Sequence, residues 1–265
     1  QLLFSHALKK TSHVLVPSEN TKKDLMRVFH YKEEKIAVTP LAAGEEFDGT
    51  VGGERGIGKV ALAGWDKLQL NLKEKYNLPD DFILTVAGLE PRKNVKILLE
   101  ILPWLKKNHP QTKLVIVGGK GWKSDALQKE IREAGSQVAG DRIVASGPII
   151  HIEQGEGSEL PLFYKLARVF IYPSLYEGFG LPPLEAMASG CPVICSNTSS
   201  LPEVCGDAVL MFDPKDAEGL KKNLEKILAD EELRAELIDR GLKQAQKFSW
   251  KKTAEKTLEI FTMLQ

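Results

Sequence analysis

Short, almost continuously apolar runs alternate with longer amphipathic stretches along most of this chain. Such runs are typical of strands whose two faces are both covered. Strands are predicted at Val14–Val16, Ile36–Thr39, Phe82–Ala87, Leu114–Val117, Ile143–Ser146, Val169–Tyr172, Val193–Ser196 and Ala208–Phe212. Because covered strands separated by helices need crossover connections, this order predicts an α/β fold with a Rossmann-like, doubly wound parallel sheet.

The stretches between the strands show the apolar spacing of helices that lie on a sheet. Helices are predicted at Glu19–Phe29, Asn94–Lys107, Ser124–Ala139, Ser158–Ala167, Pro183–Ser189, Asp216–Ala229 and Glu231–Lys247. In an open sheet of this kind, ligands bind beyond the carboxyl ends of the strands. The loops that follow the strands are therefore the places where a site is expected.

The strand–helix pattern lapses in the glycine-rich stretch 42–60, which is typical of a linker. The predicted division is therefore the end of a preceding domain at 1–45, a linker at 46–65, a complete domain at 66–248 and a C-terminal helix at 249–265. Since the chain opens at Gln1 in the middle of a pattern, we expect a fragment that holds only a remnant of its N-terminal domain. The C-terminal helix is expected to pack back against that domain.

Composition argues against some classes of partner and site. Lys plus Arg and Asp plus Glu both number 36, so the net charge gives no support to nucleic acid as the main partner. No run approaches the roughly 18 apolar residues of a membrane span, and no signal peptide is visible. A cytoplasmic location is expected, with peripheral contact at the inner face of a membrane left open. The cysteines Cys191, Cys195 and Cys205 lack zinc-site spacing and are expected to pack in the core.

Several motifs typical of other chemistries are incomplete here. Gly53–Lys59 has the P-loop spacing, but Val60 stands where a Ser or Thr is required, so a linker is preferred. No dinucleotide-binding glycine fingerprint follows Phe82–Ala87, and no Asp-x-Asp pair offers a metal-bridged diphosphate site. Gly118–Gly121 is interpreted as a turn that needs positive φ, with a loop bordering a ligand as the alternative.

The first candidate segment is Gly88–Asn94 (GLEPRKN), which follows the strand Phe82–Ala87. Arg92 and Lys93 fall where a helix is predicted to begin, and cations there oppose the helix dipole. An anion held between these cations and the helix start would remove the conflict. Solvated surface charge is the alternative interpretation.

The second candidate segment is the stretch 172–185, a strand end followed by a glycine-containing turn and a proline-initiated helix. Gly178 and Gly180 let the backbone approach a ligand closely, and amides at such a turn can hold phosphate oxygens. Glu177 and Glu185 lie on either side of the turn. Carboxylates suit the paired hydroxyls of ribose or a hexose, although Glu185 alone would be read as an exposed helix residue.

The third candidate segment, Ser146–Ile150, is interpreted as a strand end that kinks outward. The backbone at Pro148 and Ile149 would then lie beside the edge of a nucleobase. A plain turn is an equal alternative on the sequence alone.

Together these segments resemble glycosyltransferase family 4, whose members are retaining enzymes of the GT-B fold. The matching stretches are GLEPRKN (88–94), YPSLYEGFGLPPLEAMASGCPVICSN (172–197), SSLPEVCGDA (199–208) and FSW (248–250). They occur in the family's order, and the resemblance covers nearly the whole chain. It implies that residues 66–248 are the C-terminal, nucleotide-sugar binding half of a GT-B fold and that residues 1–45 belong to its acceptor domain.

The resemblance also implies roles for individual residues. Glu185 would bind the nucleotide ribose, and Glu177 would contact the donor sugar. The amides of Phe179, Gly180 and Leu181 would hold the diphosphate and sugar.

Two cations complete this expected donor site, together with Gly88, Gly178, Pro148 and Ile149. Lys93 keeps the family's lysine. The arginine that many members carry shortly before it is Leu89 here, so Arg92 is expected to substitute.

The function implied is transfer of a hexose, with mannose favoured, from a GDP- or UDP-sugar to a glycan or lipid-linked acceptor, as in polysaccharide biosynthesis. No metal or other cofactor is expected, and Arg92, Lys93 and Glu177 are the expected catalytic residues. Because the acceptor would bind the missing domain, the isolated fragment should bind nucleotide without transferring sugar. The alternatives are a noncatalytic nucleotide-sugar sensor and a GT-B relative such as an epimerase or a phosphorylase.

Overall fold

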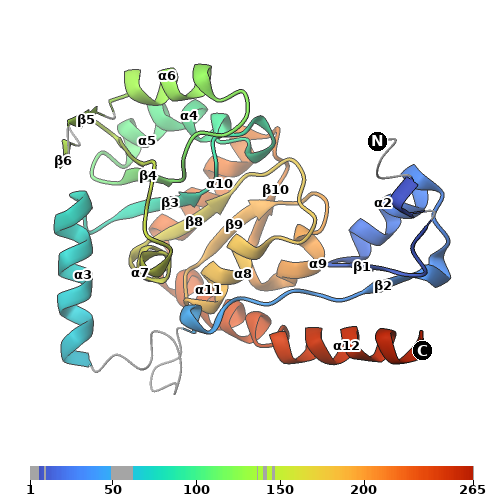
Figure 1. Ribbon diagram of the computed structural model, residues 1–265. Coiled ribbons are helices and arrows are strands. Elements are labelled where there is room, and N and C mark those ends of the chain that lie inside the picture. Colours follow the sequence, from blue (N-terminus) through green and yellow to red (C-terminus); the bar gives the residue numbers. More distant parts are fainter. Residues whose placement is uncertain are drawn as a thin grey trace.

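The computed structural model describes residues 6–8, 10–48, 62–135, 137–139, 142–144 and 147–264. A six-stranded sheet with the order β10-β9-β8-β3-β4-β7 forms its centre (Figure 1), and every adjacent pair is parallel. The strands are β3 (Phe82–Val86), β4 (Lys113–Val117), β7 (Ile149–Ile152), β8 (Val169–Tyr172), β9 (Val193–Ser196) and β10 (Leu210–Phe212). The predicted Rossmann-like parallel sheet is confirmed.

The strand order reverses at β3. From β3 the chain proceeds to β4 and β7 on one side, then returns to β8 on the other side of β3 and continues to β9 and β10. The switch point therefore lies between β3 and β8. In open α/β sheets this is the place where loops diverge and leave a crevice for a ligand.

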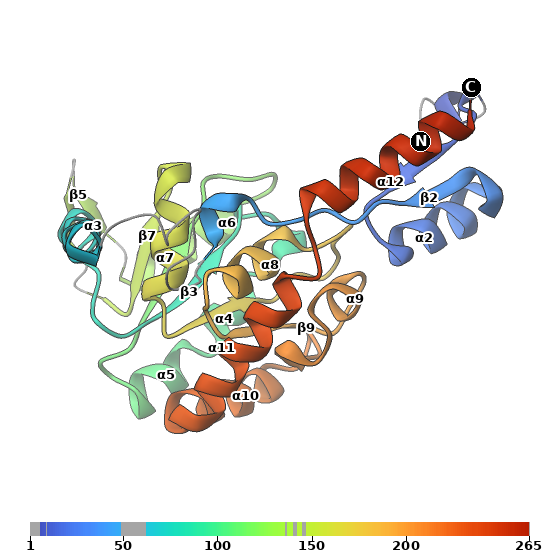
Figure 2. The same cartoon turned by 90° about the horizontal axis from the view of Figure 1, so that it is seen from below.

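Helices cover both faces of the sheet (Figures 1 and 2). One face packs against α3 (Leu62–Tyr76), α7 (Leu160–Leu166), α8 (Leu181–Ala188) and α9 (Leu201–Cys205). The other packs against α4 (Lys96–Glu100), α5 (Leu102–Asn108), α6 (Asp125–Glu133) and α10 (Ala217–Ala229), and α11 (Glu231–Ala245) contacts both α8 and α10. Alternate strand residues point to opposite faces, so Phe82 and Leu84 join one buried cluster and Ile83 the other.

Residues 10–40, which we call the N-terminal segment, form a small unit beside the sheet with a buried cluster of its own. In it β1 (Val14–Val16) and β2 (Ile36–Val38) pair in parallel around α2 (Glu19–Phe29). The predicted C-terminal helix is present as α12 (Trp250–Met263), which runs back along this segment (Figure 2). There the Thr253 hydroxyl donates to the Pro40 carbonyl at 2.5 Å.

Short 3-10 turns complete the described structure. They are η1 (Glu33–Lys35), η2 (Glu45–Phe47), η4 (Pro91–Lys93), η5 (Gly157–Glu159) and η6 (Gly206–Ala208). No helix among the described residues is both long enough and apolar enough to cross a membrane. Cys191, Cys195 and Cys205 are buried and unbonded, as predicted, and burial raises the pKa of the Cys191 thiol to about 12.

The prediction between β4 and α7 was wrong. The strand expected at Ile143–Ser146 does not join the main sheet, because β6 (Arg142–Val144) forms an antiparallel pair with β5 (Gln137–Ala139). The sheet strand is instead β7, and the helix predicted to reach Ala139 ends with α6. The β7 strand was not predicted, because the polar His151 interrupts its apolar run. Its imidazole is buried and forms a hydrogen bond of 2.9 Å with the Gly118 carbonyl.

The predicted linker at 46–65 also needs correction at its end. α3 begins at Leu62, so regular structure starts inside the stretch that was assigned to the linker. The P-loop look-alike Gly53–Lys59 lies outside the described residues.

Truncation of Phe170 should test the packing of the sheet. Its side chain is fully buried, with ring centroids 5.2 Å from Tyr164 and 5.9 Å from Tyr172. We expect Phe170→Ala to lower the free energy of unfolding by about 3–5 kcal/mol, because it leaves a cavity between two rings. Phe261→Ala, at a side chain that is 57% exposed, should change it by less than about 0.5 kcal/mol. Urea unfolding measures both values, and equal effects would contradict this packing.

Candidate functional site

The loop after β3 brings two cations to the switch point. Arg92 and Lys93 lie in the 3-10 turn η4, and α4 begins only at Lys96. The prediction that these cations stand at a helix start was therefore wrong, and the conflict with a helix dipole does not arise. Asn94 ends the turn with φ 54°, and its amide donates to the carbonyls of Pro173 at 3.1 Å and Pro214 at 2.8 Å. This side chain ties the β3 loop to the β8 loop.

Glu177 is the centre of the polar contacts at this edge. Lys93 donates to its Oε1 at 2.7 Å, and Arg92 forms an ion pair with the same oxygen at 2.8 Å. The Tyr172 and Ser174 hydroxyls donate to it as well, at 2.8 and 2.7 Å. The structure thus brings together all three predicted catalytic residues. Arg92 also lies 3.7 Å from the Glu90 carboxylate, so the two cations face two carboxylates at this edge.

The environment keeps the Glu177 carboxylate ionised. Burial by itself raises the pKa of Glu177, but the hydrogen bonds from Lys93 and Ser174, together with the Lys93 charge, outweigh burial and lower it. The pKa of the Tyr172 phenol is raised, first by burial and then by the negative charge of Glu177. The phenol therefore stays protonated and remains a donor to the carboxylate.

The loop between β8 and α8, residues 173–180, is called the Gly180 loop below. Gly180 has φ 111°, and a Cβ added there would lie 2.7 Å from Cδ2 of the buried Leu201. Gly178 has no such requirement, because its nearest neighbour would be Thr21 Oγ1 at 3.7 Å. Of the two predicted glycines, only Gly180 adopts a backbone conformation that favours glycine over other residues. It stands at the N-cap of α8 without a side-chain cap.

Backbone donors are available at this turn. Helix α8 begins at Leu181, and the first amides of a helix have no partner within it. In the part of the chain that the structure describes, the amides of Phe179, Gly180 and Leu181 make no hydrogen bond. The loop therefore presents donors next to the cationic side chains of Arg92 and Lys93, which is an arrangement suited to an anion.

Two serines that the sequence interpretation gave no role hold the loop in place. The Ser199 hydroxyl accepts from the Glu177 amide at 2.8 Å. The Ser200 hydroxyl lies 3.0 Å from the Glu177 carbonyl and 2.7 Å from the Phe179 carbonyl. Both serines follow β9, whose carboxyl end meets that of β8 at the same edge. Their position after a predicted strand was the signal that could have identified them.

Glu185 lies one helical turn beyond the loop and faces a different neighbour. The Tyr164 phenol of α7 donates to its Oε2 at 3.1 Å. Burial raises the pKa of Glu185 and the charge of Glu46 adds to this, while the Tyr164 hydrogen bond opposes it. Glu185 is thus half-buried and already oriented, not the freely exposed helix residue of the alternative interpretation.

Pro148 and Ile149 are not brought to this edge. Ile149 begins β7, and the carbonyl of the preceding Pro148 accepts from the Leu114 amide at 2.8 Å near the amino end of β4. Ile149 is fully buried. Their expected place beside a nucleobase followed from the misplaced strand, so they are left out of the site.

The two glycine turns at the β3 and β4 ends are found where they were predicted. Gly88 lies two residues beyond the end of β3, and its carbonyl accepts from the Glu90 amide at 2.7 Å. Gly118 has φ 146°, and a Cβ there would collide with the Ala87 carbonyl oxygen. The interpretation of Gly118–Gly121 as a turn that requires positive φ is therefore correct at Gly118.

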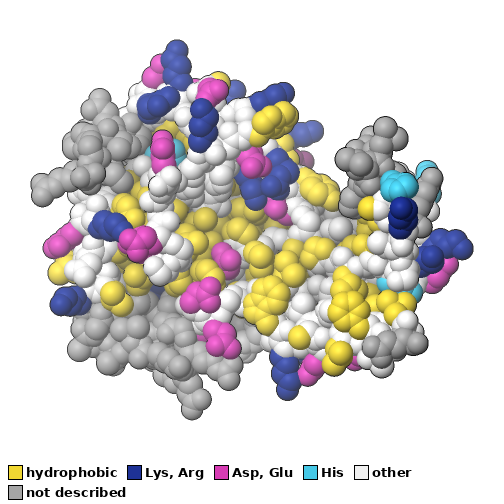
Figure 3. Space-filling view, in the orientation of Figure 1, with side chains coloured by type: hydrophobic (Ala, Val, Ile, Leu, Met, Phe, Trp, Pro, Cys, Tyr) yellow, Lys and Arg dark blue, Asp and Glu magenta, His cyan; other side chains and the backbone are white. Residues whose placement is uncertain are grey.

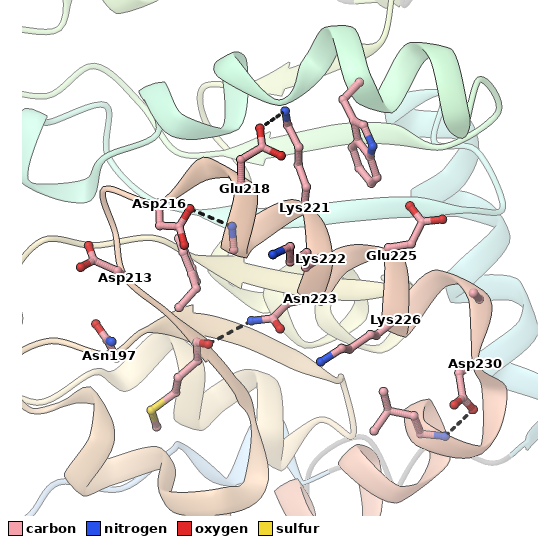
Figure 4. A pocket seen from close by; sticks show the side chains of 16 residues that line it. Asn197, Asp213, Asp216, Glu218, Lys221, Lys222, Asn223, Glu225, Lys226 and Asp230 are labelled. Carbon is pink, nitrogen blue, oxygen red and sulfur yellow. Dashed lines mark hydrogen bonds and ion pairs between the residues drawn. The ribbon is translucent and has the colours of Figure 1, made fainter.

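A hollow of about 980 Å³ lies elsewhere, along α10 (Figure 4). Some of its polar groups contact one another: Lys221 pairs with Glu218 at 2.7 Å, and Asn223 donates to the Met211 carbonyl at 2.9 Å. None of the predicted site residues lines it. We therefore regard it as a surface hollow and place the candidate site at the β3–β8 edge.

The chain belongs to the family of glycosyl transferases group 1, whose model matches residues 69–244. It is 32% identical over 260 residues to O-antigen chain mannosyltransferase B of Escherichia coli, covering 97% of this chain and 62% of that protein. It is also 32% identical over 257 residues to the serotype-specific mannosyltransferase WbdA of Escherichia coli, covering 97% of this chain and 29% of that protein. The chain therefore spans less than two thirds of these relatives.

Solved structures share the fold. Sucrose-phosphate synthase from Thermosynechococcus elongatus superposes with a TM-score of 0.77 at 22% identity, over 99% of this chain and 61% of that one. Anabaena Alr3699/HepE, solved with UDP and glucose, gives a TM-score of 0.75 at 16% identity, over 97% and 64%. The predicted GT-B class is thereby confirmed.

Neutralising Glu177 should destabilise the site in a pH-dependent way. Glu177→Gln leaves two cations without their carboxylate, so we expect the free energy of unfolding to fall by about 2 kcal/mol at neutral pH. The folded-state pKa of Glu177 lies below the ordinary value of 4.5, so its contribution is complete above that value and is lost as the pH falls through the folded-state pKa. The difference between wild type and variant should therefore shrink in acid. Urea unfolding across pH measures this, with exposed Glu232→Gln as the control; a pH-independent difference would contradict it.

The two loop glycines should respond differently to a methyl group. Gly180→Ala should lower the free energy of unfolding by about 1–3 kcal/mol, because φ is positive and Leu201 occupies the space. Gly178→Ala, two residues away, should change it by less than about 1 kcal/mol. Chemical denaturation of the matched pair checks the claim. If Gly180→Ala left the free energy of unfolding unchanged, the turn would not require a positive φ at this position.

Proposed function

We propose that this chain is the donor-binding part of a retaining hexosyltransferase of family 4, and that it binds a nucleoside-diphosphate sugar between β3 and β8. The observation that carries the proposal is the convergence of Arg92 and Lys93 on Glu177 directly before the Gly180 turn. Membership of the glycosyl transferases group 1 family supports it.

The diphosphate would bind to Arg92 and Lys93 and to the unpaired amides of Phe179, Gly180 and Leu181. Arg92 is 43% exposed, and besides Glu177 it contacts the Tyr176 carbonyl at 2.7 Å and Glu90 at 3.7 Å, so its guanidinium would exchange some of these contacts for the ligand. Lys93 is only 16% exposed and would act from a fixed position. Charge-assisted hydrogen bonds of this kind are about twice as strong as neutral ones.

Glu185 and Glu177 would bind the ribose and the hexose of the donor. Glu185 Oε2 already accepts from Tyr164, which leaves its other oxygen for a ribose hydroxyl. Glu177 Oε1 is occupied by Lys93 and its neighbours, which leaves its second oxygen for a hydroxyl of the hexose. Carboxylates accept without donating, so both positions select hydroxyl donors.

In the transfer step, the bond between the anomeric carbon and the donor phosphate breaks, and the electron pair leaves with the diphosphate. Arg92, Lys93 and the loop amides would stabilise this charge. The acceptor hydroxyl attacks from the face that the diphosphate leaves, and its proton passes to the departing phosphate oxygen, which gives retention. Glu177 is a poor nucleophile for a double displacement, since one oxygen already accepts several hydrogen bonds.

Mannose is the proposed hexose and GDP the favoured nucleotide, with UDP as the alternative. The names of the relatives, an O-antigen chain mannosyltransferase and a serotype-specific mannosyltransferase, support mannose and a glycan or lipid-linked acceptor. The acceptor site is proposed to lie in a domain outside these residues, which would also make any peripheral contact with a membrane. The chain by itself should then bind donor without transferring sugar.

Nucleotide binding tests the proposal directly. Titration calorimetry with GDP, UDP and their sugars should show binding to the 265-residue chain, and Glu185→Ala should weaken it by about ten- to a hundredfold through loss of a charged hydrogen bond. Glu232→Ala, on the exposed start of α11, should leave the affinity unchanged. No binding at millimolar nucleotide would rule out the donor site.

A second outcome bears on the acceptor. Sugar transfer by this chain alone would contradict the placement of the acceptor site in another domain. An unchanged affinity of Glu185→Ala, with binding otherwise intact, would contradict the ribose role alone.

A further inference from the structure

The Gly180 loop is held from outside the sheet domain by a pair of hydroxyl groups. Ser18 donates to the Gly178 carbonyl at 2.6 Å, and Thr21 donates to the same carbonyl at 3.0 Å. The first contact joins residues 160 positions apart. Ser18 is fully buried. The start of α2 therefore sits directly on the loop that is proposed to bind phosphate.

Ser18 performs two tasks with one oxygen. It is the N-cap of α2, where its Oγ accepts from the Thr21 amide at 3.0 Å. Its proton is directed to Gly178. The Ser18 hydroxyl thus both caps α2 and attaches it to the loop. If α2 moved away from the loop, the Ser18 hydroxyl and the Gly178 carbonyl would lose their hydrogen bond.

Further contacts seat α2 from two sides. The Glu203 carboxylate of α9 accepts from the amides of Glu19 at 2.9 Å and Asn20 at 3.3 Å, where the helix dipole favours a negative charge. The Tyr176 phenol donates to Asp24 at 2.5 Å. In Figure 3, apolar side chains continue across the middle of this face toward the N-terminal segment. The segment is therefore packed on the site.

Holding one carbonyl also orients an amide. The Gly178 carbonyl and the Phe179 N–H belong to one planar trans peptide unit, in which the two groups point in opposite directions. Ser18 and Thr21 thus determine where the Phe179 N–H points. Ser200, which holds the carbonyls of Glu177 and Phe179, does the same for the amides of Gly178 and Gly180.

We propose that Ser18 and Thr21 are positioning residues for the donor: by fixing the Gly178 carbonyl, they aim the Phe179 amide at the donor phosphate. This inference rests on the proposed function and adds a consequence to it. Seating of α2 and binding of a nucleoside diphosphate must then favour each other, because each is stronger when the loop is already in place. The N-terminal segment is in this way part of the donor site without touching the donor.

Thr21→Val tests the inference with little change in shape. It removes one of the two hydroxyl donors to Gly178 but keeps the Ser18 cap of α2. We expect the dissociation constant for GDP or UDP to rise about tenfold, as the loss of one hydrogen bond predicts. We also expect faster hydrogen exchange at the Glu177 amide, which is hydrogen-bonded to Ser199 within the same loop. Thr21→Ser keeps the hydroxyl and should restore both. Ser18→Ala combined with Thr21→Val should have a larger effect.

Thr253→Val is the matched control. Its hydroxyl also joins α12 to the N-terminal segment through the Pro40 carbonyl, but it does not contact the Gly180 loop. It should leave both the dissociation constant and loop exchange unchanged. If it weakened nucleotide binding as much as Thr21→Val, a general loosening of the segment would explain the result and the positioning role would be overturned.

The two proposals fail differently. If the wild type binds neither nucleotide, the proposed function fails, and exchange at the loop amides then decides whether the hydroxyls hold the loop. Equal exchange in wild type and Thr21→Val overturns the inference in either case. If nucleotide binds equally well to both proteins, the donor site stands and the positioning role is wrong.

Discussion

A buried carboxylate must be compensated, and the compensation of Glu177 organises this edge of the molecule. Arg92 and Lys93 supply charge, while Tyr172 and Ser174 supply hydroxyl donors to the same oxygen. Because these groups come from the β3 loop, from β8 and from the loop after it, their convergence requires β3 and β8 to be neighbours. The sheet order that places them side by side is therefore a condition for the charge balance of the site.

Compensation by side chains leaves the backbone donors of the turn for another partner. Ser199 and Ser200 hold the amide and carbonyl groups around Glu177, so the carboxylate does not need the amides that follow. Gly180 turns the chain into α8 with a positive φ. In a site of this construction protein contacts orient the donors, and donors that are already oriented need little reorganisation to stabilise a developing negative charge.

Sequence patterns predicted this site well where a local rule applied. The apolar run ending at Tyr172, the proline-initiated helix and the flanking glutamates locate the second segment, because strand ends and helix starts have strong local signals. The β7 region was misread because a buried histidine occupies an apolar strand, and only the long-range hydrogen bond to Gly118 explains its burial. Ser18, Thr21 and Ser200 were missed for a related reason. Hydroxyl groups are common on protein surfaces, so Ser and Thr residues do not stand out in a sequence. The partners of Ser18 and Thr21 lie more than a hundred residues away, and those of Ser200 lie on the neighbouring strand's loop, so no periodic pattern in the sequence indicates these contacts.

The return of α12 to the N-terminal segment has a mechanical consequence. The chain passes between the segment and the sheet domain twice, once after Pro40 and once near Ser249, and the Thr253 hydroxyl joins the two passages. Two connections joined side by side restrict the relative orientations of the segment and the sheet domain more than a single connection would. The restriction favours the one orientation in which Ser18 and Thr21 meet the Gly178 carbonyl.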